Sequence, residues 1–160
     1  MTAALVRDVE ANLPDPALAD ADWADAYEIE TAKPFASARE AAECTVSAFP
    51  LWTMPLLLLR NIIVLPLGLK GADRGFDRDM VGIFPVVVDT PGRFVGGFDD
   101  KHLDFRVAVD LAEVGERQRI RLTTVIRRHN LAGRAYLRAV MPFHRAIIRG
   151  ALAKLAAARP

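Results

Sequence analysis

The sequence has one cysteine, almost no net charge and no long apolar run free of polar residues. Cys44 cannot pair within the chain, which excludes an internal disulfide framework and fits a reducing compartment. The formal net charge of +1 argues against a protein that works mainly by binding nucleic acid. We therefore expect no nucleic acid among its partners and no support from disulfides.

The most apolar stretch, residues 51–69, reads LWTMPLLLLRNIIVLPLGL and raises the question of a membrane span. Arg60 lies near its centre, where insertion into a bilayer costs on the order of +2.5 to +3.5 kcal/mol. Pro55 and Pro66 interrupt the run as well. We expect instead an apolar helix over residues 55–65 that packs on both sides or covers a cavity.

What is present suits one folded domain. The chain has 160 residues, of which 52% are hydrophobic and 26% charged, which is too apolar for disorder and is the usual size of one domain. Residues 1–24 have no strong periodicity and are expected to form an arm or a frayed helix, with residues 25–158 as the domain. The first 25 residues are acidic and rich in alanine, unlike an export signal, so we expect a cytoplasmic protein.

Charge is distributed unevenly along the chain. Residues 1–50 hold 10 acidic and 3 basic side chains, whereas residues 111–160 hold 2 acidic and 11 basic ones. The two ends therefore have opposite charge, and we expect them to meet and neutralise each other. In particular, a strand over residues 26–31, with Tyr27 and Ile29 alternating with glutamates, should pair with the last strand and place Glu28 or Glu30 beside arginines.

Further elements follow from local patterns. Ser37 precedes Glu40 at the spacing of a capping box, which predicts a helix to about Phe49. Residues 70–80 have the glycine and charge content of a loop. Strands are predicted over residues 84–90 and 93–98, joined by a turn in which Gly92 adopts a positive φ.

Residues 102–110 and 119–129 alternate in polarity and predict a hairpin around a loop near Val114 and Gly115. One register separates the residues by polarity. It pairs Val109 with Ile120, Val107 with Leu122, Phe105 with Thr124, Leu103 with Ile126, Asp110 with Arg119 and His102 with Arg127. Phe105 and Leu122 should then be buried, and Arg106 and Arg121 substantially exposed.

The C-terminal region predicts a long helix from Leu131 to about Ala158, with Asn130 as its N-cap and a kink at Pro142. One broad sector of this helix is apolar. Its members are Tyr136, Leu137, Val140, Phe143, Ile147, Ile148, Ala151 and Leu155. A separate stripe holds Arg134, Arg138, Arg145 and Arg149. Our default interpretation is that these side chains are solvated and that some pair with the acidic N-terminal third. The alternative is that they bind an anion.

This order of elements predicts an α+β fold, a curved antiparallel sheet wrapped around a long C-terminal helix. It resembles the helix-grip fold of the START and polyketide-cyclase (SRPBCC) superfamily. The segments GGFDDKHLDFRV (96–107), RRHNLAGRAYL (127–137), VMPFHRAII (140–148) and LLLLRNIIVLPLGLK (56–70) resemble a bacterial family catalogued only as a domain of unknown function. The resemblance covers about residues 20–155, and that family brings no catalytic residues to transfer.

His144 projects into the apolar sector of the last helix and is the candidate catalytic residue. It is either a core histidine satisfied by one hydrogen bond, or it lines a cavity and contacts a ligand or acts as an acid or base. We expect a cavity between residues 131–155, residues 54–65 and the sheet. The candidate ligand-binding residues are His144, Phe143, Ile147, Val140, Phe105, Leu122, Thr124, Leu58 and Trp52.

Other clusters favour structural roles. Asp99, Asp100, His102 and Asp104 are of metal-ligand types, but the outward direction of His102 and Asp104 favours a surface ion-pair cluster, so we expect no metal and no cofactor. Cys44 is interpreted as a small buried hydrophobe. Gly96 and Gly97 predict a bulge or close packing.

Three functions remain open. The first is a module that binds an apolar or amphipathic small molecule between sheet and helix. The second is an enzyme of the cyclase, isomerase or hydrolase type that uses His144, which a carboxylate or tyrosine within reach of that histidine would favour. The third is an interaction protein that forms a homodimer through residues 51–69. Peripheral contact with a membrane is a further alternative for the partner.

Overall fold

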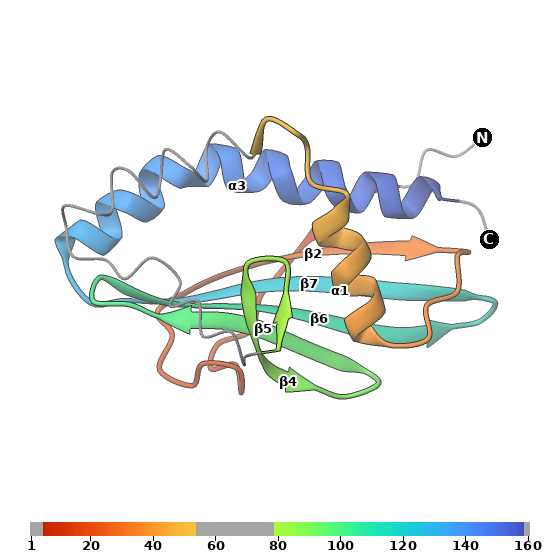
Figure 1. Cartoon of the computed structure of the whole chain (residues 1–160), viewed down its shortest axis with the longest axis horizontal. Coiled ribbons are helices and arrows are strands. Elements are labelled where there is room, and N and C mark those ends of the chain that lie inside the picture. Colours follow the sequence, from red (N-terminus) through yellow and green to blue (C-terminus); the bar gives the residue numbers. More distant parts are fainter. Residues whose placement is uncertain (1–4, 54–78, 159–160) are drawn as a thin grey trace.

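The chain folds as one twisted antiparallel sheet with helices on one face, the α+β arrangement expected from the order of elements (Figure 1). The computed structural model describes residues 5–53 and 79–158. Within them the sheet is open and has the strand order β1-β2-β7-β6-β5-β4-β3. The strands are β1 (Arg7–Val9), β2 (Trp23–Thr31), β3 (Met80–Val81), β4 (Phe84–Asp89), β5 (Arg93–Asp99), β6 (Leu103–Val114) and β7 (Arg117–Arg128).

The helices are α1 (Ala38–Ser47) and α3 (Leu131–Ala157), and both begin at the predicted caps. The Ser37 hydroxyl accepts a hydrogen bond from the Glu40 backbone N–H at 3.2 Å. The Asn130 side-chain oxygen accepts one from the Gly133 N–H at 3.0 Å. Each cap satisfies a backbone donor that the first helical turn leaves free. Helix α3 continues through Pro142 and is curved where it passes over the sheet (Figure 1).

The predicted pairing of the first predicted strand with the last is confirmed. β2 runs antiparallel to β7, with Glu28 opposite Arg121 and Glu30 opposite Arg119. Glu28 lies 3.3 Å from Arg121, and Glu30 lies 3.5 Å from Arg119. The opposite charges at the two ends of the chain therefore meet across one pair of strands.

The register predicted for the β6–β7 hairpin is wrong by two residues. Val109 faces Leu122 and Val107 faces Thr124, while Phe105 faces Ile126 and Asp110 faces Arg121. The cause is the turn: Val114 pairs with Arg117, so only Gly115 and Glu116 connect the strands, and Gly115 adopts a φ of 62°. A shift of two positions keeps every side chain on its predicted face.

Burial along this hairpin matches the prediction fully only at Leu122, and the other three positions are intermediate. Leu122 is buried, as expected, and Arg121 is partly exposed. Phe105 is only partly buried, because it packs at the edge of a small cluster with Leu103 and Ile126. Arg106 is 13% exposed instead of lying in solvent, because it folds over the position opposite, Gly97, which has no side chain, and pairs with Asp99 at 2.8 Å.

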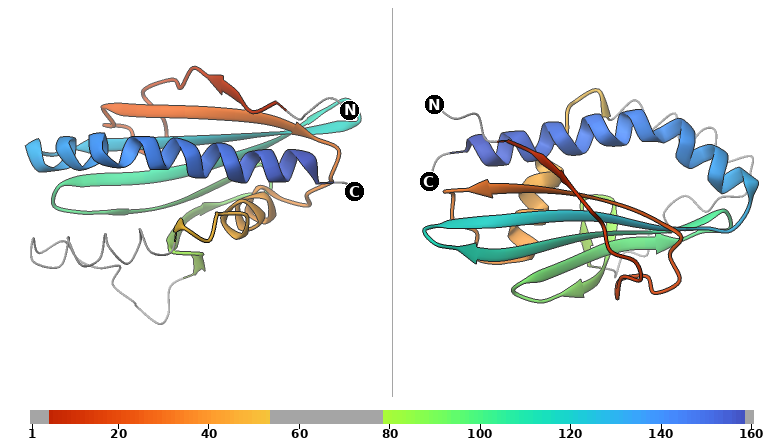
Figure 2. Two further views of the ribbon diagram at one scale, coloured as in Figure 1. Left: turned by 90° about the horizontal axis from the view of Figure 1, so that it is seen from above. Right: turned by 180° about the vertical axis from the view of Figure 1, so that it is seen from behind.

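Residues 5–24 of the N-terminal arm pack on the domain and include a strand that the sequence did not predict. Arg7–Val9 forms β1 at the edge of the sheet beside β2. After β1, the arm crosses the face of the sheet opposite the helices (Figure 2). Asp15 binds Arg93 at 2.8 Å, and Asp20 pairs with Arg127. The acidic arm is therefore held by arginines of the central strands.

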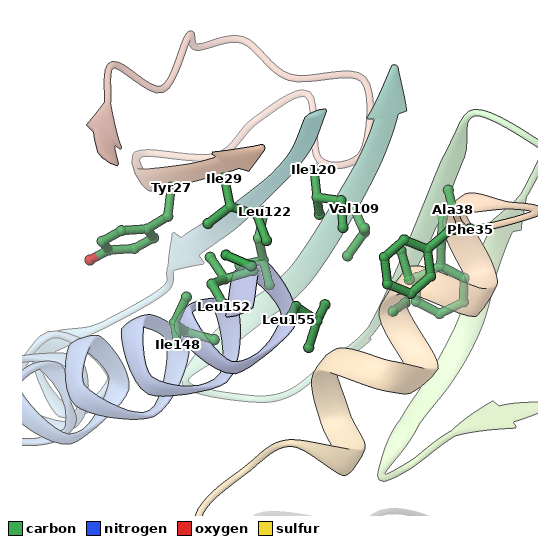
Figure 3. Close-up of a cluster of buried hydrophobic side chains, with 14 of the residues drawn as sticks. Tyr27, Ile29, Phe35, Ala38, Val109, Ile120, Leu122, Ile148, Leu152 and Leu155 are labelled. Carbon is green, nitrogen blue, oxygen red and sulfur yellow. The ribbon is translucent and has the colours of Figure 1, made fainter. Parts of the chain in front are cut away.

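The main core lies between the C-terminal half of α3, helix α1 and the inner face of the sheet (Figure 3). Here the inner face is the one that carries Tyr27, Ile29 and Leu122, against which α3 places Ile148, Leu152 and Leu155. Burying each such aliphatic side chain contributes roughly 1.5–3 kcal/mol. A smaller cluster of Leu103, Ile126 and Leu137 anchors the N-terminal half of α3.

Two further predictions concern turns and the apolar segment. Gly92 does not adopt a positive φ, so the predicted turn type is wrong; Thr90 and Arg93 close the turn instead through mutual backbone hydrogen bonds. The apolar helix predicted over residues 55–65 lies outside the described residues. Across residues 5–53 and 79–158, no helix has the length and hydropathy needed to cross a bilayer.

Candidate functional site

An acid and a histidine from opposite ends of the chain meet where α3 crosses β2. The Nε2 atom of His144 lies 3.1 Å from one carboxylate oxygen of Asp25 and 3.4 Å from the other. Both side chains are mostly buried, at 13% exposure for His144 and 17% for Asp25. The hydroxyl of Thr124, which lies opposite Asp25 on β7, approaches the same Nε2 atom at 3.5 Å.

These contacts follow from strand periodicity. Alternate residues of β2 share one face of the sheet, so Trp23, Asp25 and Tyr27 all point toward α3 with Ile29. The Trp23 ring lies edge-on to the His144 imidazole, with centroids 6.4 Å apart and an interplanar angle of 74°. An aromatic ring on one side and a carboxylate on the other restrict the orientation of the imidazole.

Tyr27 extends the polar cluster. Its hydroxyl donates a hydrogen bond to Asp25 at 3.2 Å. Burial, together with the neighbouring Asp25 carboxylate, which disfavours a second negative charge, raises the pKa of Tyr27 to about 12. Tyr27 therefore keeps its proton at neutral pH and acts as a donor. We call Asp25, Tyr27, Thr124 and His144 the Asp25–His144 cluster.

A pocket of about 280 Å³ opens beside this cluster, between β1, β2 and α3. It lies at the edge of β2, where the short strand β1 ends and leaves part of that edge uncovered. Asp25 and Tyr27 belong both to the pocket wall and to the cluster. The full lining is Asp8, Val9, Ala11, Ala24, Asp25, Ala26, Tyr27, Arg145 and Arg149.

The arrangement can bind and move a proton. A carboxylate in contact with an imidazole orients the ring and stabilises its protonated form, which is the usual support for a general base. Tyr27 and Thr124 supply hydroxyl groups at the same point. No group of three metal-ligating side chains occurs in the part of the chain that the structure describes.

The structure brings together some of the predicted site residues and separates others. His144 and Thr124 are in contact. Leu122 is buried in the main core, Val140 and Ile147 are partly buried on α3, and Phe105 stacks on Phe84 and Phe98. Phe143 and Trp52 are 47% and 45% exposed, so Phe143 is not part of the buried helix face. Leu58 lies outside the described residues, as does part of the wall of the predicted cavity.

Sequence reasoning missed Asp25 and Tyr27 as members of the cluster. The predicted strand began at Ala26, three residues after the observed start at Trp23, which left Asp25 in a connecting segment. The signal was present, because Asp25 lies two positions before Tyr27 and so has to share its face once the strand is extended. The contact with His144 spans 119 positions and has no local signature.

The remaining candidate residues have structural roles. Of the cluster of Asp99, Asp100, His102 and Asp104, Asp104 pairs with His129 at 3.0 Å and Asp99 pairs with Arg106, whereas His102 contacts the side chain of Asn130. Cys44 is partly buried and packs against the main core. A Cβ atom at Gly97 would lie 2.1 Å from the carbonyl oxygen of Phe105, which confirms close packing there. On α3, Arg149 pairs with Asp8 of β1.

Comparison with known proteins identifies the family. None of the curated proteins matches the sequence. The model of a family described as "Protein of unknown function (DUF2867)" matches residues 17–151. The matched range includes all four members of the Asp25–His144 cluster and confirms the resemblance to a domain of unknown function. The chain belongs to the DUF2867 family.

Proposed function

We propose that the protein binds a hydrophobic or amphipathic small molecule between the inner face of the sheet and α3, with the polar end of that molecule at the Asp25–His144 cluster. The proposal rests on the contact between the buried side chains of Asp25 and His144. A largely buried carboxylate costs several kcal/mol in lost hydration unless partners compensate, so core packing alone would favour apolar residues here. Desolvated acid–base pairs are more frequent at functional sites.

The strand register indicates where the apolar part of the bound molecule would lie. Asp25, Thr124, Val107, Gly96 and Val86 form one continuous row across β2, β7, β6, β5 and β4 on the inner face. After Asp25 the row holds only small side chains, and we call these four positions the small-residue row. A short apolar group could lie along its first part, beside Thr124 and Val107, with its polar end at Asp25 and His144.

The rows on both sides of the small-residue row are larger. One contains Tyr27, Leu122, Val109 and Phe94, and the other Trp23, Ile126, Phe105 and Phe98. The space above Gly96 is filled by its neighbours, since a Cβ atom there would lie 2.9 Å from the Cβ of Phe84 and 3.3 Å from the ring of Phe94. We therefore expect the apolar part of the molecule beside Thr124 and Val107, between the two bulky rows. Ligand sites of this kind are mostly apolar, with a few polar groups that set orientation. The resemblance of the element order to the START and polyketide-cyclase superfamily supports the same location.

Native mass spectrometry of freshly purified protein tests this function. We expect a retained apolar molecule in the wild type. Val107→Phe fills the small-residue row and should abolish retention, whereas Val87→Phe makes the same change at a position that is 48% exposed and should not. Thr124→Val keeps the shape of the row, removes the hydroxyl beside His144 and should weaken retention. Equal retention in all four proteins, or none in the wild type, would contradict the proposal.

A second candidate function is acid–base catalysis on the bound molecule. The Asp25 carboxylate lies 3.1 Å from His144, and Tyr27 donates to the same carboxylate, which is the kind of contact that favours an enzyme over a simple carrier. If the retained molecule is incubated with the protein in D₂O, an enzyme of this kind should exchange a carbon-bound hydrogen for deuterium. His144→Gln should slow that exchange by about 10²-fold or more. A molecule that gains no deuterium beyond a protein-free control contradicts such proton transfer.

A further inference from the structure

The pocket between β1, β2 and α3 lies on the other side of Asp25 from the small-residue row and has a different chemical character. Its apolar wall consists of short side chains, from Val9, Ala11, Ala24 and Ala26. Its volume of about 280 Å³ is just below the range of roughly 300–1,000 Å³ typical of sites for drug-sized ligands. A small ligand with a short aliphatic body fits these dimensions.

Within the described residues, all but one of the charged side chains in the pocket wall have a partner of opposite charge or a hydrogen-bond partner. Asp8 forms an ion pair with Arg149, whose guanidinium also lies over the ring of Tyr27 at 5.7 Å from its centroid. Asp25 is engaged by His144 and Tyr27. Arg145 lies one helical turn before Arg149 and lines the same pocket, yet it has no ion pair or hydrogen bond within residues 5–53 and 79–158.

The positive charge of Arg145 acts on the interior of the pocket. Arg145 lowers the pKa of Tyr27, opposing the larger upward effects of burial and Asp25. A guanidinium group presents a planar fork of donors that matches a carboxylate in two parallel hydrogen bonds. With Asp8 and Asp25 already in the wall, a singly charged anion is favoured over a doubly charged one, because like charges repel.

We propose that this pocket is a binding site for a short-chain aliphatic carboxylic acid, with the carboxylate on Arg145 and the hydrocarbon part against Val9 and the alanines. The pocket shares Asp25 and Tyr27 with the Asp25–His144 cluster, but the proposal rests on Arg145 and the short apolar side chains of the wall, so it does not depend on the function proposed above. Arg145 is exposed like Arg134 and Arg138, and it differs from them in lining the pocket.

Butyrate and butyramide are matched probes, since they have the same length and differ in charge. Titration of each into ¹⁵N-labelled protein, followed by ¹H–¹⁵N NMR, should show saturable shifts at Val9, Ala24 and Ala26 with butyrate. Butyramide should bind about tenfold more weakly or worse, since it lacks the charge-assisted hydrogen bonds. Inorganic phosphate, tested the same way, should bind more weakly than butyrate.

Arg145→Gln should weaken butyrate binding by about tenfold and leave butyramide binding unchanged. Arg138→Gln is the matched control, because Arg138 is an exposed arginine on the same helix outside the pocket wall. The proposal is overturned if butyrate binds no better than butyramide, if phosphate binds best, or if Arg145→Gln and Arg138→Gln behave alike. The butyrate and butyramide comparison needs only the wild-type protein, so it decides the question even if a variant folds poorly.

Discussion

At the scale of single residues, Tyr27 links the candidate site to the stability of the fold. Its pKa is about 12 in the folded protein against 10.0 for the free side chain, so the folded state holds the phenolic proton more tightly. Stability from this source is complete below pH 10 and is lost as pH rises through 12. Between these values the wild type should lose roughly 2–3 kcal/mol more than Tyr27→Phe in urea titrations. Equal curves for the wild type and Tyr27→Phe would contradict this ionisation.

The size of residue 97 is tightly constrained, so only glycine fits there. A Cβ atom there would lie 2.1 Å from the carbonyl oxygen of Phe105, and neither backbone can move without breaking the β5–β6 pairing. Gly97→Ala should therefore destabilise the protein by about 3 kcal/mol or more. Gly92→Ala is the control, since a Cβ atom there meets only an ordinary contact at 3.8 Å and should change stability by no more than about 0.5 kcal/mol. Thermal denaturation of both variants measures the difference, and similar losses would refute the steric argument.

At the scale of elements, the N-cap of α3 determines where the helix that carries His144 begins. Asn130→Ala removes the acceptor for the Gly133 N–H and should cost about 1 kcal/mol. Asn130→Asp keeps an acceptor in the same place and should recover most of that loss. Chemical denaturation with urea gives both values. A loss in Asn130→Asp as large as that in Asn130→Ala would show that the cap oxygen is not what stabilises the helix start.

Elements were predictable from the sequence where local chemistry determines them. Two kinds of feature depend only on neighbours within a few positions and can therefore be predicted from the sequence. They are the helix caps at Ser37 and Asn130 and the alternation of polarity along β6 and β7. The hairpin register was not, because it depends on a turn of two residues, and the sequence pattern fits two registers equally well in polarity. β1 has only three residues and gains its order from pairing with β2, so it has no period of its own.

At the scale of the whole molecule, the distribution of charge along the sequence predicted which strands are neighbours, and periodicity did not. The acidic first third and basic last third indicated that β2 and β7 would be neighbours, and their glutamate–arginine pairs confirm it. The Asp25–His144 cluster was only half predictable: the direction of His144 followed from helical periodicity, but its partner lies 119 positions away. Contacts at that separation follow from the packing of α3 on β2, which no local pattern encodes.

The central claim is that a small molecule meets the protein at the Asp25–His144 cluster, and the ¹⁵N resonances of the imidazole rings test it most directly. The chain has three histidines, so His144 can be assigned by comparison with His144→Gln, and His129, paired with Asp104, serves as an internal control. Spectra are recorded before and after the retained molecule is removed by organic extraction and refolding. We expect the His144 resonances to shift on removal, to return when the extract is added back, and those of His129 to stay unchanged. Superimposable His144 resonances in the three samples, with the molecule shown by mass to be bound and then removed, would contradict the account.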